Sequence, residues 1–218
     1  MSRRIALVHA VQPAMQPIAD AFRDHWPEAD CANVLDDSLS RDREKSVEIS
    51  ADIFKRFDML GAYAADIGAD GLLFTCSAFG EAIEAVAAKA AFPVLKPNEA
   101  MFEAALQRGR TIGMLATFVP SVASMEREFY DMAKERNADA TIRTICVPKA
   151  MEALNKGNAA THNALLADVA PQLAGCDAIL LAHFSTSRAE KAVKQVVSVP
   201  VLTSPVAAVQ KLRSLLGA

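Results

Sequence analysis

The sequence predicts an α/β protein of two pseudo-symmetric lobes, each a three-layer αβα arrangement around a parallel four-stranded sheet. Two observations predict this fold. Short apolar runs alternate with longer helical patterns along the 218 residues, which is typical of parallel sheets covered on both faces. The second half also repeats the first at a constant distance in residue number. This distance, the one from Cys76 to His183, is called the repeat offset below. Duplicated halves of this length indicate two similar lobes that face each other.

The repeat holds across three apolar segments without slippage. Each half is close to the usual size of a domain and is long enough to bury a core. A repeat of this period is too long for a solenoid, so it indicates duplicated lobes. The aligned segments are 5–8 with 112–115, Asp70 with Asp177, and 93–95 with 200–202.

The first half alternates four apolar runs with four helical patterns. The nearly continuous apolar character of residues 71–75 predicts a strand buried on both faces, as parallel strands are. Apolar side chains at helical spacing over residues 43–67 predict one long amphipathic helix, and Gly68 supplies its stop. The expected strands span residues 4–10, 31–35, 71–75 and 93–95, and the expected helices span residues 16–25, 43–67, 81–91 and 99–107.

The second half repeats this order. Its two central apolar runs, at residues 111–116 and 178–182, match the first and third strands of the first half. A long helix over residues 158–173 takes the place of the long helix at 43–67. The expected strands span residues 111–116, 141–147, 178–182 and 199–202, and the expected helices span residues 121–135, 158–173, 188–196 and 206–215.

The composition is that of an ordinary globular protein, with 52% hydrophobic and 22% charged residues and a formal net charge of −3. No basic patch favours nucleic acid or an anionic membrane, and no apolar run approaches the roughly 20 residues of a membrane span. The four cysteines have no paired spacing, which favours reduced thiols and a cytoplasmic location. A homo-oligomer is possible, although the sequence specifies no interface.

Ligands of open parallel sheets bind at the carboxyl ends of the strands. Four loops of the repeat lie at such ends, at residues 10–12, 76–78, 117–121 and 183–186. If the lobes face each other about a pseudo-dyad, these loops converge on one cleft. Cys76 and His183 then stand on opposite walls of that cleft.

Cys76 and His183 are the candidate catalytic residues. A thiol at a helix N-terminus meets the positive end of the helix dipole, which stabilises the thiolate. The structural alternative for Cys76 is a small buried hydrophobe, which is what most free cysteines are. An unperturbed histidine has a pKa near 6.5, so we expect His183 to exchange protons near neutral pH. Its structural alternative is a histidine hydrogen-bonded within a loop.

The other candidates are substrate-binding residues at the same strand ends. Hydroxyl groups together with helix N-termini make a plausible carboxylate cradle, although serine and threonine also cap helices. The candidates are His9, Gln12, Thr75, Ser77, Ala78, Thr117, Phe118, Ser121, Phe184, Ser185 and Thr186. If Phe118 and Phe184 line the cleft, the preferred substrate carries an apolar or aromatic group.

Several motifs are missing from the sequence. It has no Gly-x-Gly-x-x-Gly, no phosphate-binding loop of the Walker type, and no cysteine or histidine spacing suited to zinc. We therefore expect no cofactor and no metal, and a small carboxylate as the substrate.

Three segments resemble the aspartate/glutamate/hydantoin racemase superfamily, whose relatives include arylmalonate decarboxylase and maleate isomerase. They are residues 68–77 (GADGLLFTCS), residues 111–117 (TIGMLAT), and residues 93–95 (PVL) leading to Glu99-Ala100. The resemblance covers essentially the whole chain and implies the racemase-like two-lobed fold. In that family the C-terminal helix returns to the first lobe, which implies lobe one at 1–98 plus 206–218 and lobe two at 99–205.

The resemblance also implies a chemistry. Family racemases carry one cysteine on each lobe and move a proton alpha to a carboxylate, whereas decarboxylase relatives keep a single cysteine on the second lobe. Here Cys76 matches the first-lobe cysteine, and His183 stands where the second is expected. The leading hypothesis is a cofactor-independent racemase or isomerase of a small acid, amino acid or hydantoin, with Cys76 and His183 as opposed acid/base groups. The alternatives are a cysteine-dependent decarboxylase of a substituted malonate and a non-catalytic protein that binds small carboxylates.

Overall fold

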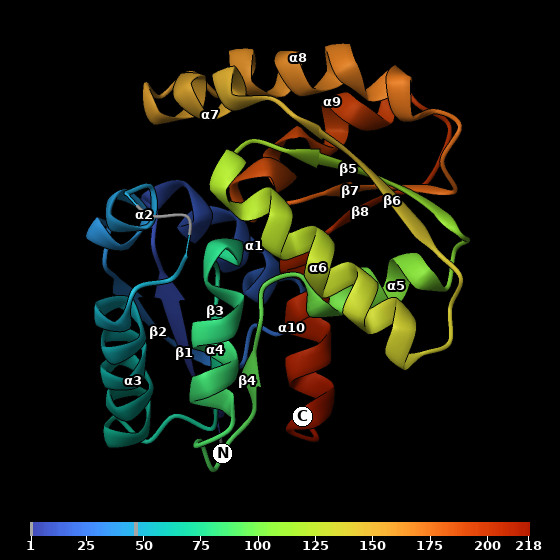
Figure 1. Cartoon of the computed structure of the whole chain (residues 1–218). Helices are drawn as coiled ribbons and strands as arrows, with labels where there is room; N and C mark the ends of the chain where they lie inside the picture. The colour runs from blue at the N-terminus through green and yellow to red at the C-terminus, as the bar shows by residue number, and fades with distance from the viewer. Residues whose placement is uncertain (1, 46–47) are drawn as a thin grey trace.

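The computed structural model describes residues 2–45 and 48–218 and shows two lobes, each built on a parallel sheet with helices on both faces (Figure 1). The strand order is β2-β1-β3-β4 in one sheet and β6-β5-β7-β8 in the other. The predicted fold class is confirmed. The strands are β1 (Arg4–His9), β2 (Asp30–Leu35), β3 (Gly71–Phe74), β4 (Val94–Leu95), β5 (Thr111–Ala116), β6 (Thr141–Cys146), β7 (Ala178–Leu181) and β8 (Val201–Thr203).

Helices follow the strands in both halves. The first half holds η1 (Gln12–Ala14), α1 (Met15–His25), α2 (Ser38–Arg43), α3 (Ala51–Asp66), η2 (Ser77–Phe79), α4 (Gly80–Ala87) and α5 (Glu99–Leu106). The second half holds α6 (Val119–Glu135), α7 (Pro148–Asn155), α8 (Ala159–Val169), η3 (Ala170–Leu173), η4 (Ser185–Ala189), α9 (Glu190–Lys194) and α10 (Ser204–Leu215).

The sequence repeat carries over into the hydrogen-bond register of the sheets. Ile5 pairs with Gly71 in the first sheet, and Ile112 pairs with Ala178 in the second, so both pairs obey the repeat offset. The strands β3 and β7 are completely buried, as their unbroken apolar character predicts. The edge strand β2 starts at Asp30, and its counterpart β6 starts at Thr141. The distance in residue number between these two starts is called the edge offset below, and it is longer than the repeat offset. The second lobe therefore contains extra residues before β6.

The paired aspartates of the repeat have a structural role. Asp70 accepts a hydrogen bond from the Arg4 backbone N–H at 2.8 Å, and Asp177 accepts from the Arg110 and Thr111 N–H groups at 2.8 Å. Each carboxylate thus satisfies backbone donors at the start of the central strand of its sheet. The Arg4 N–H group and the Arg3 side chain lower the pKa of Asp70.

The helix predicted over residues 43–67 is wrong at its start, because α3 begins only at Ala51 and α2 ends at Arg43. The helix α2 ends at Arg43, and α3 begins after Ser50, whose hydroxyl accepts the Ile53 N–H at 3.4 Å as an N-cap. Residues 46 and 47 of the predicted helix lie outside the described residues. The apolar spacing that predicted a helix is therefore sound only from Ala51 onward.

The helix predicted over residues 158–173 forms as α8 followed directly by the 3-10 helix η3, and a further helix, α7, precedes it. The helix α7, which the sequence did not predict, begins at Pro148 and ends before Gly157, whose φ of 78° breaks the helix. Asn158 then caps α8 through its side chain, which accepts the Thr161 N–H at 3.0 Å. Because Pro171 cannot continue an α-helix, the chain passes into the short 3-10 helix η3.

The last helix of each half packs on the sheet of the other half. Met101 and Phe102 of α5 lie in a core cluster with Ile112 of the second sheet. Val209 and Leu212 of α10 lie in a cluster with residues of β1 and α1, and Figure 1 shows α10 in the same lobe as β1 and β3. The division of the chain at residues 98 and 206 stays a prediction, and the packing of α10 is the observation that favours it.

Lys211 links α10 to α5, the two helices that pack on the sheet of the other half. Its ammonium group on α10 forms ion pairs with Glu99 and Glu103 of α5. Within the described parts of the chain, no helix is both long and apolar enough to cross a membrane.

Candidate active site

The carboxyl ends of the two sheets enclose a small cavity of about 90 Å³. The loops after β1, β3, β5 and β7 contribute to it, as the position of ligand sites in parallel sheets predicts. The segments α2 and α7 also reach it. The lining residues are Val11, Ala14, Ser40, Glu44, Thr75, Cys76, Phe118, Met151, Asn155, His183, Phe184 and Ser185.

The central strands place two repeat-equivalent pairs on this cavity. Cys76 follows β3 and His183 follows β7, and both line the cavity. Val11 and Phe118, which follow β1 and β5, form the second pair. The cavity is therefore shared between the lobes in the way that the repeat predicts.

The edge strands add two further pairs at the edge offset. Ser40 pairs with Met151 and Glu44 pairs with Asn155 at this spacing, and all four residues line the cavity. Because the same offset relates β2 to β6, α2 and α7 are equivalent elements. The equivalence is in position alone, because the first lobe supplies a hydroxyl and an acid where the second supplies a thioether and an amide.

Burial determines the charge state of Cys76. The thiol precedes η2, and the Ala78 N–H donates a hydrogen bond to it. Burial raises the pKa of Cys76 to about 11, and the Ala78 N–H and the Arg43 cation counter this only in part. The expected effect of neighbouring N–H groups is present, but desolvation outweighs it, so Cys76 is a neutral thiol near pH 7.

Arg43 is a contributor that the sequence did not identify. This side chain is only 6% exposed, and its Nε donates to the Ala78 carbonyl oxygen at 3.0 Å. It thereby fixes the loop that follows Cys76, and its charge favours the thiolate. An arginine in a polar, charged segment is typical of a solvated surface, so the sequence carried no signal for this role.

Hydrogen bonds within the second lobe define the tautomer of His183. The Thr117 backbone N–H can only donate, and it lies 3.4 Å from His183 Nδ1, so Nδ1 is an acceptor. The ring proton then sits on Nε2 and is donated to Ser121 Oγ at 2.7 Å. Ser121 donates in turn to the Phe118 carbonyl oxygen at 2.8 Å. The short hydrogen bond at Nε2 fixes the orientation of the ring, whereas the contacts of Nδ1 are longer, at 3.3 to 3.4 Å.

Burial acts on His183 in the opposite direction to Cys76. It lowers the pKa of His183 to about 4, and the neighbouring His162 lowers it further. Since burial disfavours the charged form, it disfavours imidazolium in His183 and thiolate in Cys76. The two candidate catalytic groups are consequently both neutral near pH 7.

His9 does not line the cavity. It is fully buried, with Nδ1 2.9 Å from Thr75 Oγ1 and Nε2 2.9 Å from Asn33 Oδ1. Since the Asn33 oxygen can only accept, Nε2 carries the proton and Nδ1 accepts from the Thr75 hydroxyl. Burial lowers the pKa of His9. His9 therefore orients Thr75, which does line the cavity.

The predicted site residues divide into two groups. Six of them line the cavity, and the others lie behind it or beside it. Thr117, Ser121 and Thr186 contact His183, whereas Ser77 has a buried hydroxyl oxygen without a hydrogen-bond partner. The lining residues are Thr75, Cys76, Phe118, His183, Phe184 and Ser185, and those that do not line it are His9, Gln12, Ser77, Ala78, Thr117, Ser121 and Thr186.

Six further lining residues were missed. Val11 lies inside the predicted loop at residues 10–12 but was not singled out, and Ala14 lies two residues beyond that loop. Ser40 and Glu44 belong to or directly follow α2, and Met151 and Asn155 belong to α7. These four side chains follow the edge strands, where the repeat offset no longer holds. A search at the longer edge offset would have paired them.

Contacts between the lobes hold the loops that carry Cys76 and His183. The Ser124 hydroxyl on α6 donates to the Ser77 carbonyl oxygen at 3.2 Å. In the other direction, Arg188 of η4 donates to the Pro13 carbonyl oxygen at 3.3 Å. Each loop is thus anchored to the first helical segment of the opposite lobe, which fixes the two walls of the cavity relative to each other.

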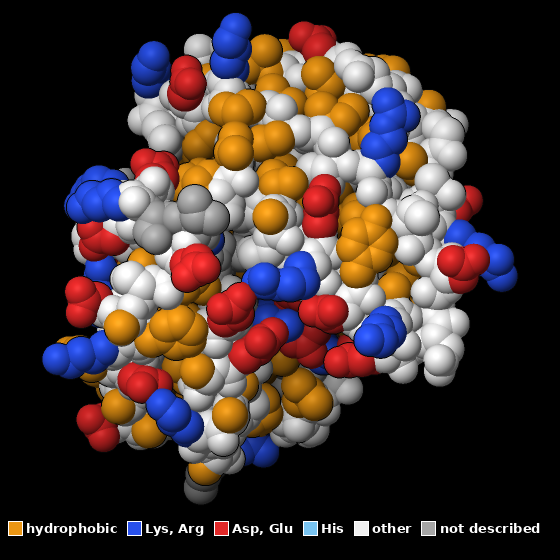
Figure 2. All heavy atoms as spheres, in the orientation of Figure 1, with side chains coloured by type: hydrophobic (Ala, Val, Ile, Leu, Met, Phe, Trp, Pro, Cys, Tyr) orange, Lys and Arg blue, Asp and Glu red, His pale blue; other side chains and the backbone are white. Residues whose placement is uncertain are grey.

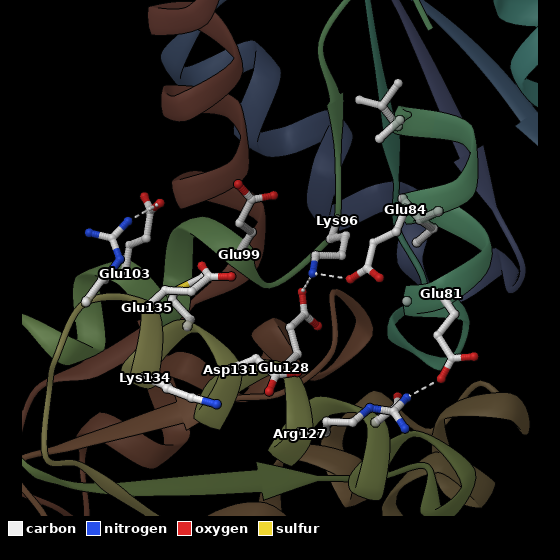
Figure 3. A pocket seen from close by; sticks show the side chains of 17 residues that line it. Glu81, Glu84, Lys96, Glu99, Glu103, Arg127, Glu128, Asp131, Lys134 and Glu135 are labelled. Carbon is white, nitrogen blue, oxygen red and sulfur yellow. Dashed lines mark hydrogen bonds and ion pairs between the residues drawn. The ribbon is translucent and has the colours of Figure 1, made fainter. Parts of the chain in front are cut away.

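A separate, charged groove of about 860 Å³ lies between α4, α5 and α6 (Figure 3). Lys96 bridges Glu84 and Glu128 in its centre, and Arg127 pairs with Glu81. Burial raises the pKa of Glu128. Figure 2 shows acidic and basic side chains gathered on this face. Because its charges pair across the two lobes, the groove serves as an ionic contact between them.

No group of three or more histidine, cysteine or acidic side chains suited to a metal ion occurs among residues 2–45 and 48–218. The polar groups that line the cavity are hydroxyls, an amide, a thiol, an imidazole and one carboxylate. Such a set suits hydrogen bonding and proton transfer.

Comparisons with known proteins show the same fold. No protein-family model and no curated protein sequence matches the chain. A glutamate racemase from Bacillus anthracis is 15% identical, with a TM-score of 0.79 over 99% of this chain and 82% of that chain. An allantoin racemase from Klebsiella pneumoniae is 17% identical, with a TM-score of 0.73 over 99% of this chain and 88% of that chain. The aspartate racemase of Picrophilus torridus is 15% identical, with a TM-score of 0.70 over 99% and 95%.

These neighbours confirm that the chain has the two-lobed fold of the racemases that its sequence resembles. At identities of 15% to 17%, the shared property is the fold.

Proposed function

We propose that this protein is a cofactor-independent racemase or isomerase that moves a proton alpha to the carboxylate or carbonyl of a small acid, amino acid or hydantoin. Cys76 and His183 are the opposed acid/base groups. The observation that carries the proposal is that they line one cavity from equivalent positions in the two lobes. Their pKa values, about 11 and about 4, are displaced in opposite directions, which is how acid and base assignments separate in a site.

The ligand-free charge states define one direction of proton transfer. His183 presents an unprotonated Nδ1, and Cys76 presents an S–H group. Nδ1 accepts the alpha proton, the electron pair of the C–H bond passes into the carboxylate to form an enediolate, and the Cys76 S–H delivers a proton to the opposite face. The step leaves an imidazolium and a thiolate, and the reverse step converts the other enantiomer from that state.

Groups around each partner support the charges that develop. The Ala78 N–H and the Arg43 cation stabilise the Cys76 thiolate. Ser185 lines the cavity, and its hydroxyl is available to the carboxylate and the developing enediolate. Thr75 also lines the cavity, but it donates its hydroxyl hydrogen to His9. Ser77 and Thr117, which the sequence suggested for this purpose, lie outside the cavity lining, and Thr117 instead contacts His183.

The racemase fold of the neighbours supports this proposal, since they are named as racemases of glutamate, aspartate and allantoin. A small carboxylate substrate, a cytoplasmic location and a possible homo-oligomer stay predictions.

A decarboxylase of substituted malonates is the second candidate. Both ring nitrogens of His183 contact groups of the second lobe, and Cys76 is protonated near neutral pH. A protonated thiol alone can deliver a proton to an enediolate that carbon dioxide leaves behind. In that reaction His183 would only position the substrate, and the cysteine would act from the first lobe.

Proton NMR in deuterated water separates these functions. Chiral amino acids, hydantoins and substituted malonates are incubated with the wild-type protein, Cys76→Ala and His183→Gln. Exchange of an alpha proton with loss of optical purity, dependent on both residues, supports the racemase. Release of carbon dioxide that depends on Cys76 supports the decarboxylase. Ligand-induced thermal stabilisation without turnover, retained in Cys76→Ala, supports a binding protein and overturns both enzymes.

A further inference from the structure

The cavity is polarised between the two lobes. Of the equivalent pairs at its edge, the first lobe contributes Ser40 and Glu44, and the second contributes Met151 and Asn155. Among the described residues, Glu44 is the one charged side chain that lines the cavity, and no lysine or arginine lines it. A ligand therefore meets an acid on one side and a neutral wall on the other.

The neutral wall is largely apolar. Phe118 and Met151 of the second lobe line the cavity together with Phe184, and Val11 and Ala14 add apolar surface from the first lobe. A second carboxylate placed against this wall would lose its hydration without gaining a cation, which is costly. It would also lie near Glu44, an exposed acid at the edge of the cavity. The lining of the cavity therefore disfavours the binding of dicarboxylic acids.

We infer that the substrate is a small α-amino acid with a short apolar side chain, whose ammonium group is recognised by Glu44 and whose side chain contacts Phe118 and Met151. The inference rests on the proposed function, since it assumes that the cavity of Cys76 and His183 binds the substrate. The small volume of about 90 Å³ limits the side chain to a few carbon atoms. The Ser185 hydroxyl remains available to the α-carboxylate.

Binding and turnover test this inference separately. Binding is measured by calorimetry with alanine, 2-aminobutyrate, propionate, aspartate and glutamate, in the wild type and in Cys76→Ser, which cannot complete the proton transfer. We expect alanine or 2-aminobutyrate to bind at least about tenfold more tightly than aspartate, because like charges in one interface cost binding free energy. Propionate lacks the ammonium group and should bind about tenfold more weakly than alanine.

Variants of the edge residues sharpen the test. Glu44→Gln should weaken alanine binding about tenfold and leave propionate unchanged, whereas Glu48→Gln, a matched exposed acid outside the cavity lining, should change neither. Met151→Arg should shift the preference toward aspartate. Aspartate or glutamate binding as tightly as alanine, propionate binding as tightly as alanine, or no binding of any compound would overturn the inference.

The two proposals can fail separately. Cysteine-dependent exchange with aspartate preferred over alanine would overturn the substrate class and leave the racemase intact. A preference for alanine in binding, without exchange or decarboxylation in the wild type, would overturn the racemase and leave the recognition by Glu44 intact.

Discussion

The strand ends of the two lobes carry the same pair of side chains in exchanged positions. In the first lobe, His9 ends β1 and Thr75 follows β3, and their side chains are 2.9 Å apart. In the second lobe, Thr117 follows β5 and His183 follows β7, with 3.3 Å between the hydroxyl and the ring. The histidine therefore lies at the end of the first central strand in one lobe and of the second central strand in the other, and the threonine does the reverse. The sheets that carry them are nevertheless related by the repeat.

The two histidines differ in how far along their strands they lie. His9 is the last residue of β1 and is completely buried, and its repeat equivalent is Ala116. His183 lies just past the end of β7 and lines the cavity, at the position equivalent to Cys76. The position at the strand end thus decides whether an imidazole belongs to the scaffold or to the wall of the cavity.

Removing the thiol of the first lobe should have the largest effect. Cys76→Ala is expected to reduce alpha-proton exchange about 10³-fold, since a positioned acid/base group contributes about 10² to 10⁴-fold. Exchange is followed by NMR in deuterated water, with circular dichroism to verify folding. Cys146→Ala serves as the matched control, because that thiol does not line the cavity. Equal loss in both variants would contradict a specific role for Cys76.

Acid should destabilise the fold through His183. Its pKa is near 6.5 in the unfolded chain and about 4 in the folded protein, so the unfolded state binds more protons between these values. The free energy of unfolding should therefore fall as pH drops from about 6.5 to about 4, by up to about 3 kcal/mol from this group.

Urea unfolding at several pH values measures this dependence. His183→Gln should flatten it, but a residual slope should remain, because burial also lowers the pKa of His9 and of His162. A slope unchanged in His183→Gln would show that the imidazole of the second lobe is not held neutral by the fold.

The thiol of the first lobe should react slowly. A pKa of about 11, against an ordinary value of 9.0, leaves about a hundredfold less thiolate near neutral pH. Alkylation of Cys76 by iodoacetamide, followed by peptide mass spectrometry, should be about a hundredfold slower in the folded protein than in urea and should accelerate up to about pH 11. Arg43→Met should slow it further. Equal rates in the folded and unfolded states would refute the neutral thiol.

The smallest expected effect concerns His9, the buried histidine of the first lobe. Thr75→Val leaves His9 Nδ1 without its buried donor, which should cost about 1 to 2 kcal/mol in the free energy of unfolding. Thr186→Val in the second lobe should cost less, since its contact with His183 is 3.3 Å long. Urea unfolding measures both, and a larger cost for Thr186→Val would contradict the proposed difference between the two lobes.

Much of the site was accessible from the sequence, because it lies where the repeat places strand ends. Cys76, His183 and Phe118 were found in this way. The helix α7 was missed because it is short, spanning only Pro148–Asn155. Met151 and Asn155 were missed with it.

By itself, the sequence determined the two parallel sheets, their internal repeat and the pairing of Cys76 with His183, since apolar periodicity and strand-end position are local properties of the chain. The tertiary structure alone decided the charge states of these two groups and the parts played by Arg43 and Glu44. Burial and neighbouring charges arise from segments far apart in the chain, such as α2 against the loop after β3. Desolvation depends on how those segments pack, and no local pattern records it.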